Sequence, residues 1–225
     1  TDPENSKILY ILPLTCIFLI PTLHRTVMPE RFVEHYGGGT WFKAAFLHTF
    51  TFLALSFLLV NPPFGDIAAP ELASKWTVVT DDGDDIAYPH SMATSSSTLT
   101  WHTDGSPILE GEAWLLFGLM DNVNSDGAVV EVTREYQANE TAREDNISYW
   151  NNNADRIANG SSTSNRSAPN LTPHGDLDQP FSVFLGTDLE EGTHKIVVII
   201  TEQGDPWENV QKYTWNLIVT SDSAV

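Results

Sequence analysis

The stretch WFKAAFLHTFTFLALSFLLV, residues Trp41 to Val60, decides how the rest of this chain is organised. It is twenty residues long, and its only formal charge is Lys43 near the start. A helix rises about 1.5 Å per residue, so this length crosses the hydrocarbon core of a bilayer, which is about 30 Å thick. The stretch therefore predicts a transmembrane helix over residues 41–60.

A shorter apolar run precedes it, ILYILPLTCIFLIPTL from Ile8 to Leu23, and this run has no charged residue. As a helix it would be about 25 Å long, with two prolines that membrane helices tolerate as kinks. A cleaved signal peptide is the alternative. The polar tail 1–7 is more acidic than basic, however, and no small-x-small cleavage site follows the run. We expect a retained first transmembrane helix over residues 8–23.

The linker over residues 24–40 indicates the orientation. It carries Arg25 and Arg31, and Lys43 follows at the edge of the second helix, whereas the tail has a single lysine. Cytoplasmic loops are enriched in basic residues, so we expect the linker in the cytoplasm and both termini outside the cell. Within the linker we predict one short helical turn, followed by a flexible turn at Gly37–Gly39.

Charge and cysteine content exclude several classes of partner and site. Residues 72–225 carry twenty-four acidic and seven basic residues, against six and four in residues 1–71. So acidic a region repels nucleic acid and anionic lipid, and it suits a strongly hydrated or high-salt exterior. The single cysteine, Cys16, lies in the first apolar run. Disulfide frameworks, multi-cysteine zinc sites and iron–sulfur clusters within one chain are therefore excluded.

A connector over residues 61–73 leads into a β-rich domain over residues 74–225, where Val, Ile, Thr, Trp and Phe dominate short runs. Seven such runs predict an antiparallel sandwich, with Trp101 and Trp114 adding to its core. The predicted strands cover residues 75–80, 98–102, 112–120, 128–136, 181–185, 194–202 and 212–220.

One segment of this domain, residues 137–180, is rich in Asn, Ser, Thr and Asp and poor in apolar residues. It is too long for an ordinary loop, so we expect either a surface excursion or partial disorder. It contains five N-x-S/T sequons, and their clustering predicts N-linked glycans on an exported surface. The acceptor asparagines are Asn139, Asn146, Asn159, Asn165 and Asn170.

His48 is the one ionisable residue in the middle of the second apolar stretch. Ionisable groups within membrane helices are candidates for function. A neutral histidine hydrogen-bonded at a helix–helix contact is favoured over a proton or metal role. A polar helical face around it would meet Thr15 and Cys16 of the first span. Its members are Ala45, His48, Thr49, Phe52 and Ser56.

Two patterns raise the question of metal binding. His90, Met92 and His102 lie in one region, and copper sites use histidine and methionine. The layout resembles cytochrome oxidase subunit two: two spans, both termini outside, then a β-sandwich of similar length. That family's dinuclear copper motif needs two cysteines, and residues 74–225 contain none. A mononuclear copper site remains a hypothesis, against ordinary surface and strand-end histidines.

Calcium is the second metal that the sequence indicates as a candidate. A dense acidic turn holds Asp81, Asp82, Asp84 and Asp85 around Gly83. Residues 122–127, NVNSDG, partly match the start of an EF-hand loop, but Thr133 stands where the bidentate glutamate is required. Acidic solvated turns are the simpler interpretation of both.

The C-terminal hairpin gives a fold resemblance. Residues 188–220 contain an acidic start, Gly192-x-His194, an alternating strand, a turn with Gly204 and a final strand. This run resembles the last hairpin of immunoglobulin-like surface domains, which implies a fold and no particular function. Tyr213, Trp215 and Leu217 would then share one face of the last strand.

These patterns together predict a membrane helical hairpin of two spans followed by an all-β extracellular immunoglobulin-like sandwich. We find no G-x-S-x-G or HExxH motif, so we expect a non-catalytic accessory or structural subunit at a cell surface. The expected partners are the bilayer and other membrane subunits, and acidity favours an archaeal surface. A cupredoxin-like electron-transfer subunit and a calcium-dependent or glycan-binding adhesion module are the alternatives.

Overall fold

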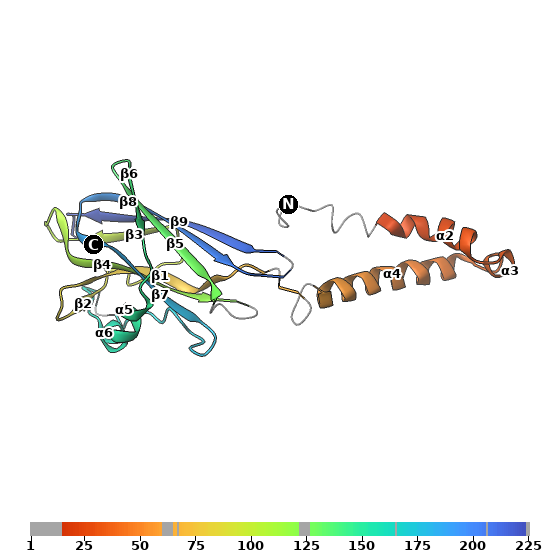
Figure 1. The fold of residues 1–225 in the computed structure, drawn as a ribbon, viewed down its shortest axis with the longest axis horizontal. Helices are drawn as coiled ribbons and strands as arrows, with labels where there is room; N and C mark the ends of the chain where they lie inside the picture. Colours follow the sequence, from red (N-terminus) through yellow and green to blue (C-terminus); the bar gives the residue numbers. More distant parts are fainter. Residues whose placement is uncertain are drawn as a thin grey trace. The chain divides into compact units, whose positions relative to one another are not determined.

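The computed structural model describes residues 15–59, 65–66, 68–121, 127–164, 166–205 and 207–223. The chain forms two compact units, Thr1–Gly65 and Asp66–Val225. The first unit contains helices and the second contains two β-sheets, as the ribbon in Figure 1 shows.

The helical unit is a hairpin. A 3₁₀ helix, η2 (Cys16–Leu19), continues into α2 (Ile20–Val27), and the short α3 (Glu30–Val33) precedes the long α4 (Gly38–Leu59). Both η2 and α2 pack against α4. In the described part of the chain, α4 alone is long and apolar enough to cross a membrane. The predicted span 8–23 falls partly outside the described residues, so the two-span arrangement stays a prediction.

Two boundaries of this unit differ from the sequence prediction. The first helix continues to Val27, four residues beyond the expected end, and the residues added include His24 and Arg25. The long helix begins at Gly38 rather than Trp41. The carbonyl of Gly37 accepts hydrogen bonds from the amides of Thr40 (3.0 Å) and Trp41 (3.2 Å), so this glycine run enters the helix instead of forming a free turn.

The second unit is a sandwich of two sheets. The first sheet has the order β2 (Ile86–Ala87), β1 (Glu71–Asp81), β4 (Ile108–Met120) and β7 (Gln179–Glu190). The second has the order β3 (Thr98–His102), β9 (Asn209–Thr220), β8 (Gly192–Glu202), β5 (Val129–Tyr136) and β6 (Asn139–Arg143). β3 runs parallel to β9, and the other pairings between these strands are antiparallel. Each of the seven predicted strands is present, and β2 and β6 are additional.

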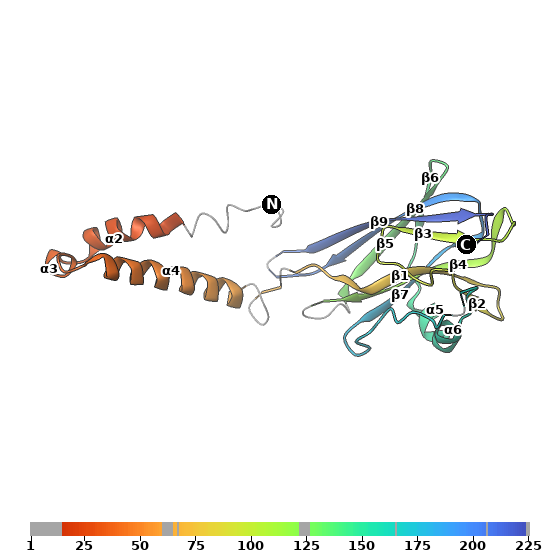
Figure 2. The ribbon, with the colours of Figure 1, turned by 180° about the vertical axis from the view of Figure 1, so that it is seen from behind.

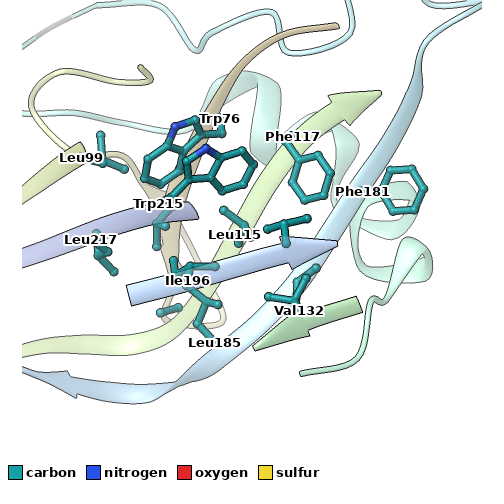
Figure 3. Close-up of a cluster of buried hydrophobic side chains, with 14 of the residues drawn as sticks. Trp76, Leu99, Leu115, Phe117, Val132, Phe181, Leu185, Ile196, Trp215 and Leu217 are labelled. Carbon is teal, nitrogen blue, oxygen red and sulfur yellow. The ribbon is translucent and has the colours of Figure 1, made fainter. Parts of the chain in front are cut away.

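The main core lies between the two sheets (Figure 3). The Trp76 ring from β1 stacks on the Trp215 ring from β9, with 4.7 Å between ring centroids. Phe117 contacts the same Trp215 edge-on at 5.6 Å. Aromatic pairs in these geometries stabilise beyond the area that they bury, because the ring quadrupoles align favourably. These rings therefore join the two sheets at the centre of the domain.

A second core lies on the outer face of the first sheet. Here α5 (Ile147–Asn152) and α6 (Ala154–Asn159) lie beside β1, β2 and β7, as Figures 1 and 2 both show. The Tyr149 ring from α5 stacks on the Trp114 ring from β4 at 3.7 Å. Residues 113–119 of β4 are consequently buried without interruption. The segment 137–180 is therefore not a loose excursion, because its described part contains two helices that cover a hydrophobic sheet face.

His194, on β8, gives the sandwich a pH dependence. Its Nε2–H donates to the Glu190 carbonyl at 2.8 Å, and its ring stacks on Tyr136 at 4.3 Å. Burial lowers the pKa of His194 below 6.5, and Arg134 adds to this effect, while Glu190 opposes it. Below about pH 6.5 the unfolded chain thus binds a proton that the folded chain does not bind.

We therefore expect the contribution of His194 to the free energy of unfolding to fall as the pH is lowered through about 6.5, and H194F to remove this contribution. Phenylalanine keeps a ring against Tyr136 but takes no proton. Urea unfolding of the wild type and the variant at a series of pH values measures the difference in slope. Equal slopes for the two proteins would show that His194 does not contribute.

Candidate functional site

The residues of the predicted polar face lie on α4, which packs against η2 and α2. Ala45, His48, Thr49, Phe52 and Ser56 are half-buried, and most of the intervening α4 residues are exposed. Thr49 Oγ1 donates to the Ala45 carbonyl at 3.0 Å, so the helix itself satisfies this hydroxyl. On the other arm, Cys16 is half-buried and Thr15 is exposed. The predicted contact of this face with Thr15 and Cys16 stays a prediction.

The opposite surface of α4 is strongly apolar. Phenylalanine and leucine side chains on it keep about half to three quarters of their area exposed. Exposed apolar surface on this scale marks contact with lipid or with another protein. The exposed large residues of α4 are Phe42, Phe46, Leu47, Phe50, Leu53, Leu55, Phe57, Leu58 and Leu59.

The described sequon asparagines are accessible. Asn139 lies on β6, Asn146 and Asn159 lie at α5 and α6, and Asn170 follows in a loop; the four are exposed. Asn146 also caps α5, since its side-chain oxygen accepts from the Tyr149 amide at 3.2 Å. Asn165 lies outside the described residues. Two of these sites, Asn146 and Asn159, thus lie in the α5–α6 layer, whereas Asn139 lies at the turn between β5 and β6.

The three residues proposed for copper do not share one surface. His90 and His102 line a cavity of about 160 Å³ together with Trp101. Met92 is buried in the second core. The Nδ1 atom of His90 lies 3.2 Å from the Thr163 hydroxyl, and His102 Nδ1 lies 3.0 Å from the Asp222 carbonyl. The histidines are thus brought together, and the methionine is not.

In the acidic turn proposed for calcium, the first two carboxylates accept hydrogen bonds from the protein itself. Asp81 is buried, and both of its oxygens accept from Arg156, at 2.6 and 3.0 Å. The Asp82 side chain accepts from the amides of Asp84 (2.9 Å) and Asp85 (2.8 Å). Asp84 and Asp85 line a cavity of about 290 Å³ beside Arg156. In the second calcium candidate, residues 122–127, all residues but Gly127 lie outside the described part of the chain.

The pKa of Asp81 reflects this arrangement. Burial alone would raise it, but hydrogen bonds from Arg156, Gly83 and Tyr149 lower it below its usual value. The carboxylate is therefore held ionised and anchors α5 and α6 to β1.

A carboxylate cluster that the sequence reasoning missed lies at one end of the sandwich. Asp66, Asp121 and Glu202 each have an oxygen within 4.8 Å of the others. Asp66 precedes β1, Asp121 follows the last residue of β4, and Glu202 ends β8. Glu202 is 5% exposed, whereas Asp66 and Asp121 are half-buried.

A signal for this cluster exists in the alternation of β8. Ile196, Val198 and Ile200 point into the core, and the same two-residue period places Glu202 on the inward face. An inward-facing glutamate at the end of an apolar strand is unusual, since such a group is rarely buried without a partner. The other two members come from distant segments, which no local pattern could associate with it.

Comparison with known proteins assigns this chain to no family. No protein-family model matches the chain, and no curated protein matches it. Its function is therefore argued from its own residues.

Proposed function

We propose that this chain is a membrane-anchored surface protein that acts as a non-catalytic accessory or structural subunit of a membrane complex. The observation that carries the proposal is α4, a 22-residue helix whose large apolar side chains are exposed in the described structure. Water does not solvate such a surface favourably, so it requires lipid or another membrane segment.

The finer proposal has three parts. The hairpin crosses the bilayer twice, with its short basic linker in the cytoplasm and both termini outside. The sandwich is immunoglobulin-like and extracellular, which its two-sheet architecture and its C-terminal hairpin β8–β9 support. Glycans on the exposed sequon asparagines, with the strongly acidic composition, suit an archaeal cell surface.

Lateral assembly is the second element of this function. The half-buried face of α4 is used within the hairpin, whereas its exposed face is available to other subunits. Ala45 lies on the half-buried face and Ala54 on the exposed face. The two residues are nine positions apart. At 3.6 residues per turn their side chains therefore point to opposite sides of the helix. The same substitution at each position therefore tests one face at a time.

The test purifies the full chain in a mild detergent from its native membrane, with mass spectrometry of co-purified proteins and of glycans. We expect a partner that recurs in every wild-type preparation and is lost in A54L, because the added side chain obstructs the exposed face. A45L should keep the partner as long as the hairpin stays folded. It should also lower the melting temperature. A chain that alkaline carbonate releases from membranes, or that never retains a recurring partner, would refute the proposal.

A further inference from the structure

We propose that Asp66, Asp121 and Glu202 bind a divalent cation, and that this cation is calcium. The three carboxylates each present an oxygen within 4.8 Å of the others. Calcium binds oxygen at about 2.4 Å, so two oxygens on opposite sides of one ion lie about 4.8 Å apart. Oxygens no farther apart than this can therefore share one ion after at most small movements of their side chains.

The backbone that carries these groups is fixed by hydrogen bonds. The Asp66 amide donates to the Asp205 carbonyl at 2.8 Å, and the Asp205 amide returns a bond of 2.9 Å. The Asn209 side chain donates to the carbonyls of Asp66 (3.3 Å) and Ala68 (2.8 Å). The segment before β1 is thus attached to the β8–β9 turn, which holds Asp66 beside Glu202.

Glu202 supplies the observation that points to a ligand. Its side chain is almost fully buried, and its Oε2 atom accepts no hydrogen bond from any residue that the structure describes. Burying an ionised carboxylate without compensation costs several kcal/mol, so such groups in proteins are paired or bind metals.

The surrounding charge makes the case for a cation stronger. The carboxylates of Asp66 and Asp121 lie within 4.8 Å of the buried carboxylate of Glu202. Three acidic groups this close repel one another unless they are protonated or neutralised. A divalent ion neutralises them together.

The ligand chemistry selects calcium among the common metals. The three groups are all carboxylates, with no histidine or cysteine among them, and carboxylate oxygens suit calcium and magnesium rather than copper or zinc. Calcium accepts six to eight oxygen ligands in flexible geometry, whereas magnesium requires near-octahedral geometry and retains its waters. A site built from three separate chain segments matches the flexible requirement, with water completing the coordination.

The expected consequence is structural. The ion would join the segment that follows α4 in sequence, the end of β4 and the end of β8, which belong to both sheets of the sandwich. Calcium should therefore stabilise this end of the domain and hold Asp66 in place. This conclusion does not depend on which side of the membrane the sandwich occupies.

The test uses the full chain in detergent micelles, stripped of metal with EDTA and dialysed. Isothermal titration with calcium chloride should give one site per chain, with a Kd of roughly 0.1–1 mM, the range of extracellular calcium modules. The melting temperature should rise by several degrees at about a hundredfold excess over Kd. Absence of any rise would overturn the proposal, and an equal rise with magnesium would overturn the assignment to calcium.

E202Q separates ligand loss from misfolding. Glutamine has the same shape and no charge, so in EDTA this variant should melt at or above the wild-type temperature, and calcium should not shift it. E208Q is the matched control, since Glu208 is exposed in the same turn. It should respond to calcium as the wild type does. If E202Q still shows the wild-type shift, calcium binds elsewhere on this acidic surface and the site is refuted.

Discussion

Replacing Trp215 with alanine is expected to lower the free energy of unfolding of the sandwich by about 3–5 kcal/mol. Trp215 is 3% exposed, and its ring stacks on Trp76 and contacts Phe117. Alanine would remove the contacts between the two sheets and leave a cavity that neighbouring rings could fill only in part. The variant should therefore unfold at a clearly lower urea concentration.

Urea unfolding followed by tryptophan fluorescence measures this effect. W207A is the matched control. It makes the same chemical change outside the core, because Trp207 lies in the β8–β9 turn and is 39% exposed. We expect it to cost less than half as much. Equal losses at the two positions would contradict a core centred on the stacked pair.

Replacing Arg156 with alanine is expected to lower the free energy of unfolding by about 2–3 kcal/mol. The change leaves Asp81 buried without the guanidinium that donates to both of its oxygens. The loss stays below the upper range for buried ion pairs for two reasons. The Arg156 side chain is 31% exposed, and the Tyr149 hydroxyl continues to donate to Asp81 at 2.9 Å.

A double-mutant cycle checks the mechanism. D81N combined with R156A should recover part of the loss, because the uncompensated buried charge is then absent. R166A is the control, since Arg166 is an exposed arginine in the same segment. Near-ultraviolet circular dichroism should show disorder of the Tyr149–Trp114 stack in R156A only. A cycle with no coupling would mean that the ion pair does not anchor the helices.

The strands and the long apolar helix follow from local patterns in this chain. The alternation in residues 194–202 predicts β8, and the exposed apolar surface of α4 follows from the composition of residues 41–59. Local periodicity is enough in these cases, because hydrogen bonding and burial repeat every two or every 3.6 residues. Helix ends are less predictable: α4 begins at Gly38 because the amides of Thr40 and Trp41 donate to the Gly37 carbonyl, and not because glycine favours a helix.

The α5–α6 layer could not be predicted in this way. Tyr149, Ile157 and Leu171 are among the few apolar residues of a polar tract, and only the folded chain packs them in one cluster with Trp114 and Leu116 of β4. The uninterrupted apolar run of residues 113–119 did contain a signal, because strands buried on both faces lose alternation. It could show that a second layer exists, but not which segment forms it.

The sequence by itself therefore determines the long apolar helix, the seven principal strands and the acidic character of the domain, because these properties depend on neighbouring residues and on composition. Only the tertiary structure decides that Arg156 reaches Asp81 and that Asp66, Asp121 and Glu202 meet. The physical reason is the pairing of strands that are distant in the chain. Such pairing brings together side chains as distant in the chain as Asp66 and Glu202, which are 136 residues apart, and no local period encodes it.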